Sequence, residues 1–293
     1  MIHYGLEGSQ VDCPHLDLPK GLQQWNSKAN KLIAENKSPG DVILCFGGNT
    51  NKQATIGHED CYIIEPHIGY SVREVFAPYR VFTSYAQLHH YYGAINIDQH
   101  PSWYDAVIPN SISPSEFEFR EKKKDYVLYM GRVVSSKGVN IAIQATEKVG
   151  KKLIIAGAPA SLKDMGYDQT PDHVELVGVV NPDQRKELLA NAECLIGPTH
   201  YVEPFGLMVV EAHMSGTPTI TSDWGAFPET NPHGITGFRC HVIKEFVWAL
   251  EHTHLINKKA IHKRAMELYS DDVVYAQLDQ YIQRVVENDF YAE

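Results

Sequence analysis

The chain has 293 residues, a formal net charge of −10 and a hydrophobic content of 43%. That length is enough for two domains, each with a hydrophobic core of its own. The acidic balance disfavours nonspecific binding to nucleic acid or anionic lipid, and no apolar run approaches the ~20 residues that a membrane-spanning helix needs.

Short apolar runs alternate with helix-length segments along most of the chain, which indicates an α/β architecture with parallel strands. In the first part we predict strands at residues 1–4, 41–46, 61–65 and 80–84, and a helix at 85–92. Residues 109–125 are polar and include two prolines and a charge run, which is typical of a linker.

The second part cycles more regularly. We predict strands at residues 127–130, 153–156, 174–177, 194–197 and 219–221, with helices at 139–149, 182–192 and 204–214, and a mostly helical segment over the last 50 residues. Open parallel sheets bind ligands at the carboxyl ends of their strands. At those ends the sequence places Gly131-Arg132, Gly157, Gly178 and Glu203.

The strongest functional signal is EPFGLMVVE at residues 203–211. Pro204 suits the first turn of a helix, so we expect a helix that begins there and leaves Glu203 at its mouth. Beside it would lie the free N–H groups of Phe205, Gly206 and Leu207, which favour anions. Glu211 is seven positions from Pro204 and therefore on the same helix face. Taken alone, the motif also fits an ordinary amphipathic helix with a solvated Glu at each end.

This stretch and its neighbours resemble retaining nucleotide-sugar glycosyltransferases of the glycosyl transferases group 1 type. The resemblance covers roughly residues 110–240, and its segments come in the family's order: YVLYMGRVVSSKG, KLIIAG, VELVGVV, EPFGLMVVE, TPTITS and NPHGITGF. It implies the GT-B fold, in which two Rossmann-like lobes with parallel sheets face a central cleft. Residues 1–110 match more weakly and are fewer than the family's first lobe usually has, so we expect that lobe to be shortened.

On this basis we divide the chain into four parts. Residues 1–110 are expected to form the acceptor-side lobe, 111–124 a linker, 125–270 the nucleotide-sugar-binding lobe, and 271–293 a C-terminal helix that can return to the first lobe.

The resemblance also implies roles for single residues. Arg132 and Lys137 would hold the donor diphosphate, although each in isolation also fits an exposed loop cation. Glu203 and the N–H groups after it would hold the donor sugar, and Glu211 would accept from the ribose hydroxyls. The remaining donor-site positions, which act largely through backbone atoms, are Gly131, Gly157, Val177 and Gly178.

In the first lobe the resemblance points to His67, within EPHIGY at residues 65–70, as the residue near the donor sugar. It also points to Gly5 and Gly8 as a glycine loop near the phosphates. A structural His in a Pro/Gly turn and an ordinary G-x-x-G turn fit these positions equally well.

The expected reaction needs no cofactor and no metal. No Asp-x-Asp motif stands beside the phosphate site and no H-E-x-x-H is present, and cationic side chains with a helix N-terminus can replace a divalent ion. The expected donor is a UDP-sugar, although backbone contacts to the base do not distinguish uracil from guanine or adenine. The expected acceptor is a small molecule, a glycan or a lipid-linked headgroup. Residues 1–110 hold 7 Lys and Arg against 11 Asp and Glu, which disfavours a DNA acceptor.

Three other functions fit the same motifs: a nucleotide-sugar epimerase or hydrolase, a transferase acting on hydroxymethylated DNA bases, and a silent nucleotide-sugar-binding protein. Residues 1–10 lack the basic and apolar regions of a signal peptide. The five scattered cysteines are typical of free thiols in a reducing compartment. We therefore expect a cytoplasmic protein without a transmembrane segment.

Overall fold

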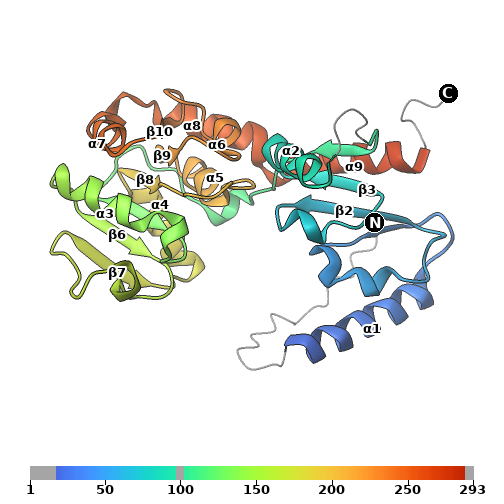
Figure 1. Ribbon diagram of the computed structural model, residues 1–293. Helices are drawn as coiled ribbons and strands as arrows, with labels where there is room; N and C mark the ends of the chain where they lie inside the picture. Colours follow the sequence, from blue (N-terminus) through green and yellow to red (C-terminus); the bar gives the residue numbers. More distant parts are fainter. Residues whose placement is uncertain (1–17, 97–101, 288–293) are drawn as a thin grey trace.

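The computed structural model describes residues 18–96 and 102–287, which form two lobes, each built on its own parallel sheet (Figure 1). Within these residues the first sheet has the order β1-β2-β3-β4: β1 (Val42–Leu44), β2 (Tyr62–Ile68), β3 (Tyr79–Phe82) and β4 (Asp105–Val107). The second sheet has the order β10-β9-β8-β5-β6-β7. Its strands are β5 (Val127–Met130), β6 (Leu153–Ala156), β7 (Val174–Gly178), β8 (Cys194–Gly197), β9 (Thr219–Ser222) and β10 (Gly237–Cys240). The predicted α/β class with two parallel sheets is confirmed.

Helices cover these sheets. The first lobe carries α1 (Leu18–Asn36) and α2 (Tyr85–Ala94). The second lobe carries α3 (Val139–Lys148), α4 (Pro182–Asn191), α5 (Leu207–Met214), α6 (Phe227–Thr230), α7 (Ile243–His252) and α8 (Lys258–Tyr269), and the final helix is α9 (Asp271–Glu287). None of the helices in the described part of the chain combines the length and the apolar character needed to cross a bilayer.

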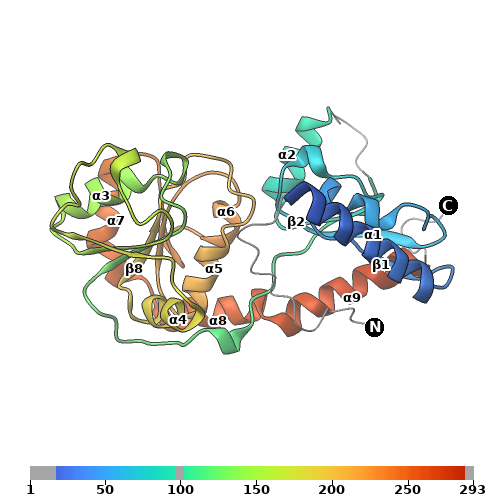
Figure 2. The same ribbon diagram turned by 90° about the horizontal axis from the view of Figure 1, so that it is seen from below.

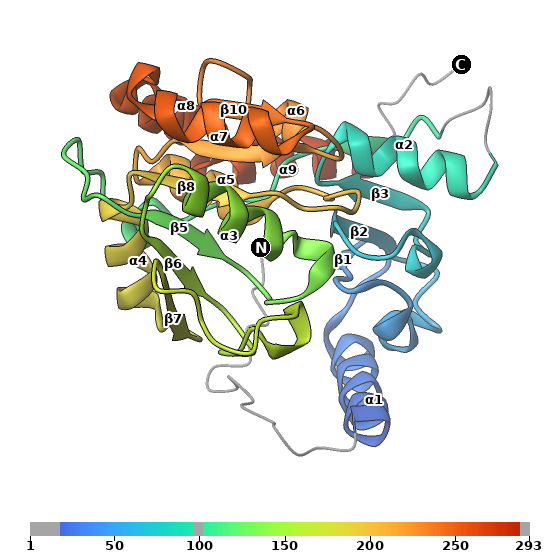
Figure 3. The same ribbon diagram turned by 60° about the vertical axis from the view of Figure 1, so that its left-hand side comes forward.

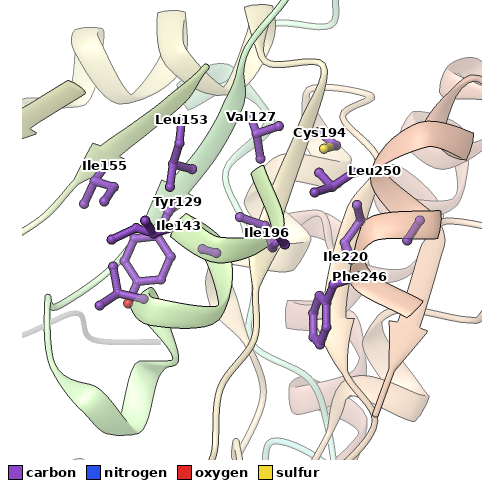
Figure 4. Close-up of a cluster of buried hydrophobic side chains, with 14 of the residues drawn as sticks. Val127, Tyr129, Ile143, Leu153, Ile155, Cys194, Ile196, Ile220, Phe246 and Leu250 are labelled. Carbon is purple, nitrogen blue, oxygen red and sulfur yellow. The ribbon is translucent and has the colours of Figure 1, made fainter. Parts of the chain in front are cut away.

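Both faces of the second sheet are buried, which explains why its strands are continuous apolar runs rather than alternating ones. Val127 and Tyr129 point to one face and pack with α3 and α7, whereas Leu128 points to the other face and packs with residues of α4 and α5. Figure 4 shows the first of these clusters, with Leu153 and Phe246 among its members. This two-sided core fixes the strand ends on which the functional residues lie.

Helix α9 connects the lobes. It follows α8 of the second lobe and runs along the first lobe (Figure 2). There Val274, Tyr281 and Val285 pack with residues of the first sheet such as Ile64 and Val81. The C-terminal helix thus contributes part of the hydrophobic core of the first lobe, whose sheet comes from the N-terminal part of the chain.

Helix α1 lies below β1 at the bottom of the first lobe, on the side away from α2 (Figure 3). It is anchored mainly by polar contacts. The buried Asn26 side chain donates to Thr50 O at 3.0 Å and accepts from Ala54 N at 3.1 Å. We did not predict this helix, although Leu22, Trp25, Ala29 and Ile33 recur at the three- and four-residue spacing of an amphipathic helix.

The predicted bounds of β5, β6 and β8 agree with the structure residue for residue. The predicted helix at 204–214 is wrong at its start: α5 begins at Leu207, because Gly206 has a φ of +81°, which a right-handed helix does not contain. The edge strand β10 was not predicted, and the strand predicted at residues 1–4 lies outside the described residues.

Candidate functional site

Three glycines meet at the carboxyl edge of the second sheet. Gly157 N donates to Gly178 O at 2.7 Å, and Gly131 N donates to Ala156 O at 2.9 Å. A Cβ on Gly157 would lie 1.8 Å from Gly131 O, so only glycine fits there. Val177 precedes Gly178 and is half-buried against the core. The sheet edge is therefore lined by close-packed backbone, while the role of these residues in framing a base stays a prediction.

A polar cluster joins the loop after β5 to the segment after β8. Lys137 ends a 3₁₀ turn, and Glu203 lies in the segment between β8 and α5. Lys137 Nζ is 3.1 Å from Glu203 Oε2 and donates to the Tyr201 hydroxyl, which in turn donates to Glu203 Oε2 at 2.6 Å. Gly138 allows this approach, because a Cβ there would lie 1.8 Å from Pro198 O. The structure thus brings together two residues that the sequence places 66 positions apart.

Tyr201 is a member of this cluster that we did not predict. Burial, followed by its bond to Glu203, raises the pKa of the Tyr201 hydroxyl, so it stays a neutral donor at physiological pH. The Lys137 ammonium lies 4.5 Å above the Tyr201 ring centroid, which adds a cation–π contact. Tyr201 lies only two residues before Glu203, outside the motif that drew attention to that glutamate.

A cavity of about 290 Å³ opens beside this cluster. From the second lobe it is lined by Arg132, Tyr201, Glu203, Pro204, Phe205, Gly206 and Leu207, and from the first lobe by Gly69 and Asn110. No side chain caps the N-terminus of α5, whose first residue lies on the cavity wall. Backbone N–H groups at such an uncapped terminus favour a negatively charged ligand.

Arg132 brings a positive charge to the same cavity. Its side chain is exposed and forms no hydrogen bond or ion pair with another described residue, so the guanidinium is available to a ligand. The planar guanidinium matches phosphate oxygens well. In the residues that the structure describes, no group of three or more His, Cys, Asp or Glu side chains is arranged to hold a metal ion.

Glu211 lies apart from this cavity, and the sequence argument that aligned it with Pro204 on one helix face is wrong, because Pro204 precedes the helix. Its Oε1 accepts from Arg185 of α4 at 2.9 Å, and Arg185 also bonds Glu116 at 2.6 Å. Burial raises the pKa of Glu211 to about 7; Arg185 opposes this shift and Glu116 adds to it. We did not predict Arg185.

In the first lobe, His67 contacts Asn110, and Asn110 lines the cavity. Its Nδ1 lies 3.1 Å from Asn110 Oδ1, so Nδ1 carries the proton and Nε2 is left as an acceptor. Burial lowers the pKa of His67, which keeps the ring neutral. Its φ of +54° is a strained backbone conformation for a residue other than glycine, of the kind that clusters at functional sites. Gly5 and Gly8 lie outside the described residues.

The two lobes contact each other at the same loop. The Pro204 carbonyl accepts from Ser84 Oγ at 2.6 Å and from Thr83 Oγ1 at 3.3 Å. The Glu229 carboxylate of α6 accepts from Tyr85 N and Ala86 N, both at 2.9 Å, in the first turn of α2. The residue that follows Glu203 is therefore also a docking point for the first lobe.

Solved structures resemble this fold. AviGT4, a glycosyltransferase involved in avilamycin A biosynthesis, has a TM-score of 0.73 and 21% identity, with 89% of this chain and 78% of that chain covered. Anabaena HepE in complex with UDP-glucose has a TM-score of 0.66 and 16% identity, with coverages of 90% and 82%. At these identities the likeness concerns the fold alone, which is GT-B.

Sequence comparisons identify the family. An uncharacterized glycosyltransferase of Methanocaldococcus jannaschii is 32% identical over 154 residues, which are 45% of this chain and 39% of that protein, so the chain spans well under half of that relative's length. The family model described as "Glycosyl transferases group 1" matches residues 113–279. That match covers more than half of the chain and includes the Lys137, Tyr201 and Glu203 cluster, and the protein therefore belongs to the glycosyl transferases group 1 family.

Proposed function

We propose that this protein transfers a sugar from a nucleotide-sugar donor to a hydroxyl group of an acceptor, with retention of the anomeric configuration. The observation that carries the proposal is the contact of Lys137, Tyr201 and Glu203 at the wall of a cavity that also contains Arg132 and the uncapped start of α5. The family membership supports transfer as the reaction. A UDP-sugar is the proposed donor, and the fold likeness to a protein solved with UDP-glucose supports it.

The main electrostatic task in such a transfer is to stabilise the charge that develops on the leaving diphosphate. Arg132 offers a planar fork, Lys137 a point charge, and the start of α5 its free backbone N–H groups. Lys137 and the start of α5 are held in place by the fold before a ligand binds, and such preorganised groups do not need to reorganise during the reaction. We propose that these groups stabilise the negative charge of the leaving diphosphate without a metal ion.

Glu203 is proposed to orient the donor sugar. Its carboxylate is buried and held by Tyr201 and Lys137 through Oε2, and no described hydrogen bond uses Oε1. An ionised carboxylate accepts hydrogen bonds readily, so the Oε1 atom suits a sugar hydroxyl. When the glycosidic bond to phosphate breaks, the leaving phosphate oxygen takes the acceptor's proton on the same face of the sugar, and the configuration is retained without an enzymic nucleophile.

Glu211 is proposed to bind the ribose through the oxygen that Arg185 does not use. Arg185 bonds Oε1, and no described hydrogen bond uses Oε2. Ribose hydroxyls donate best to an ionised carboxylate. Burial favours the protonated form of Glu211, whereas Arg185 favours the ionised form that we propose binds the ribose. On the acceptor side, the neutral His67 has Nε2 available as an acceptor from a sugar or acceptor hydroxyl.

The test has two steps. A thermal-shift panel of nucleotides and nucleotide sugars should find a donor, because a ligand that binds only the folded state raises its apparent stability. Incubation of that donor with small-molecule, glycan and lipid-linked hydroxyl acceptors should then yield a glycosylated product by mass spectrometry. Glu203→Gln, which keeps the shape of the side chain, should reduce this transfer by ~10- to 150-fold, since a charge-assisted bond contributes about 1.5–3 kcal/mol.

Each other outcome supports a different function. Free sugar or an epimer formed without acceptor would support an epimerase or hydrolase. Donor binding without any turnover would support a silent binding protein. Transfer onto hydroxymethylated duplex DNA would overturn the proposed class of acceptor.

A further inference from the structure

A second cavity, of about 500 Å³, lies in the second lobe at the carboxyl ends of β9 and β10. None of its lining residues also lines the cavity beside Glu203. The lining residues that matter for its chemistry are Asp223, Phe238, Arg239, His241, Glu245 and Trp248. Its volume is in the usual range for small-molecule sites, roughly 300–1,000 Å³, and the proposed transfer reaction does not use it.

One wall of this cavity is aromatic and held in place. The Trp248 ring stacks on His252 with centroids 4.1 Å apart and an interplanar angle of 13°, and it meets the Phe238 ring edge to face at 5.1 Å. Trp248 is nevertheless 46% exposed. An indole that packing has already oriented loses little conformational freedom when it binds a ligand. It therefore offers a rigid surface that is apolar and has one polar N–H group.

The remaining lining residues are polar and carry more negative than positive charge. Asp223 pairs with Arg239 Nε at 2.5 Å, and Glu245 accepts from His241 N at 2.6 Å. The His241 ring lies 3.6 Å from a carboxylate oxygen of each acid. Two carboxylates against one guanidinium, which is already paired, disfavour a phosphate or another anion. They favour a ligand that presents many neutral hydroxyl donors.

From this geometry we propose that the cavity is a docking site for a neutral oligosaccharide. A sugar ring has apolar C–H faces, which suit contact with the Trp248 indole, and hydroxyl edges, which suit the carboxylates of Asp223 and Glu245. A purely apolar ligand would leave those carboxylates desolvated without partners. The proposal stands on a separate cavity, so it holds or fails independently of the donor site.

The cavity lies close to the donor site, so an oligosaccharide bound in it would be near the place of sugar transfer. Asp223 begins the loop that reaches the donor cavity: the next residue, Trp224, donates from its ring nitrogen to Thr199 O at 2.8 Å. Gly225 then packs so closely on Glu203 that a Cβ would lie 2.4 Å from Glu203 N. An oligosaccharide bound here would be held beside the donor site without occupying it.

The test is isothermal titration of the full chain with three neutral oligosaccharides, maltohexaose, cellohexaose and mannohexaose. At least one should bind. Trp248→Ala should weaken that binding by about tenfold or more, as loss of an aromatic anchor does. The matched control is Trp25→Ala, which removes a tryptophan of similar exposure, 45%, from α1 of the other lobe and should change nothing.

A second variant guards against a folding defect in Trp248→Ala. Glu245→Gln removes the charge from the same cavity but keeps an oxygen that can accept from His241 N, so it should also weaken oligosaccharide binding while the melting temperature changes little. Three outcomes would overturn the proposal: no binding of any of the three oligosaccharides, unchanged binding in both variants, or displacement of the oligosaccharide by a nucleotide sugar. The last would place the glycan in the donor cavity instead.

Discussion

If Glu211 binds the ribose of the donor as proposed, its raised pKa makes donor affinity depend on pH in a predictable direction. Burial raises this pKa to about 7, with Arg185 lowering it and Glu116 raising it. If the ionised carboxylate accepts from the ribose, only the ionised fraction of the protein binds well. That fraction is about one tenth at pH ~6 and about nine tenths at pH ~8. The apparent dissociation constant of a nucleotide sugar should therefore fall about tenfold between these two values.

The assay is isothermal titration with a nucleotide sugar, whose diphosphate, as a diester, keeps a constant charge over this range. Glu211→Gln should bind with an affinity that does not change from pH ~6 to pH ~8. Glu116→Gln is a matched control, because removal of a charge that raises the pKa of Glu211 should move the transition to lower pH. Equal wild-type affinity at both pH values, or an unchanged slope in Glu211→Gln, would refute the assignment of Glu211 to the ribose.

The same shift has a consequence for stability. The pKa of Glu211 in the folded chain lies above its ordinary value of 4.5, so the protonated carboxyl stabilises the fold at low pH. This contribution is lost as the pH rises through about 7. Relative to Glu211→Gln, the wild-type free energy of unfolding should therefore fall from pH ~5 to pH ~8. The upper limit is about 3 kcal/mol, since one pKa unit corresponds to about 1.4 kcal/mol, and urea titrations at each pH measure it.

Three further predictions follow from the contacts of single residues. Lys137→Met should weaken binding of a nucleoside diphosphate and a nucleotide sugar by ~10-fold or more but spare the bare nucleoside; equal loss for all three in calorimetry would count against the diphosphate contact. Transfer should continue in excess chelator, because Lys137 and Arg132 are proposed to meet the diphosphate charge; loss with EDTA and recovery with Mg²⁺ would contradict this. Glu229→Ala should speed hydrogen exchange of the Tyr85 and Ala86 amides, whose acceptor it removes, and unchanged exchange would show that the lobe contact does not persist in solution.

The second sheet could be predicted closely from the sequence because its strands are buried on both faces. A strand such as Val127–Met130 is then a short, uninterrupted apolar run with a glycine after it, and both ends are visible. The edge strand β10, Gly237–Cys240, has no such signature, since it contains an arginine that pairs with Asp223. Helix α1 was missed although its apolar residues recur at helical spacing; what the sequence does not show is that the polar Asn26 is buried while Trp25 and Leu32 stay exposed.

The site shows the same division. The Arg132, Lys137 and Glu203 positions follow strands and could be found from motif and spacing. The start of α5 could not be found from Pro204 alone, because the left-handed Gly206 is chosen by tertiary packing: a Cβ there would lie 2.8 Å from the Phe227 ring. Arg185 was missed because its partnership with Glu211 joins two helices, 26 residues apart, and no local pattern encodes it.

Pro204 shows why the chain interrupts the helix at this point rather than starting it earlier. Inside a regular helix the carbonyl of residue 204 would bond the amide of residue 208. In the structure that carbonyl instead accepts from Ser84 and Thr83 of the first lobe, and its neighbour Glu203 faces the donor cavity. The left-handed Gly206 therefore does two things: it frees the Pro204 carbonyl for the other lobe and leaves the start of α5 without a side-chain cap, where we propose that a phosphate binds. One short loop thus links the approach of the two lobes to the shape of the donor site, so a ligand that reorders residues 203–207 should also change how firmly the lobes dock.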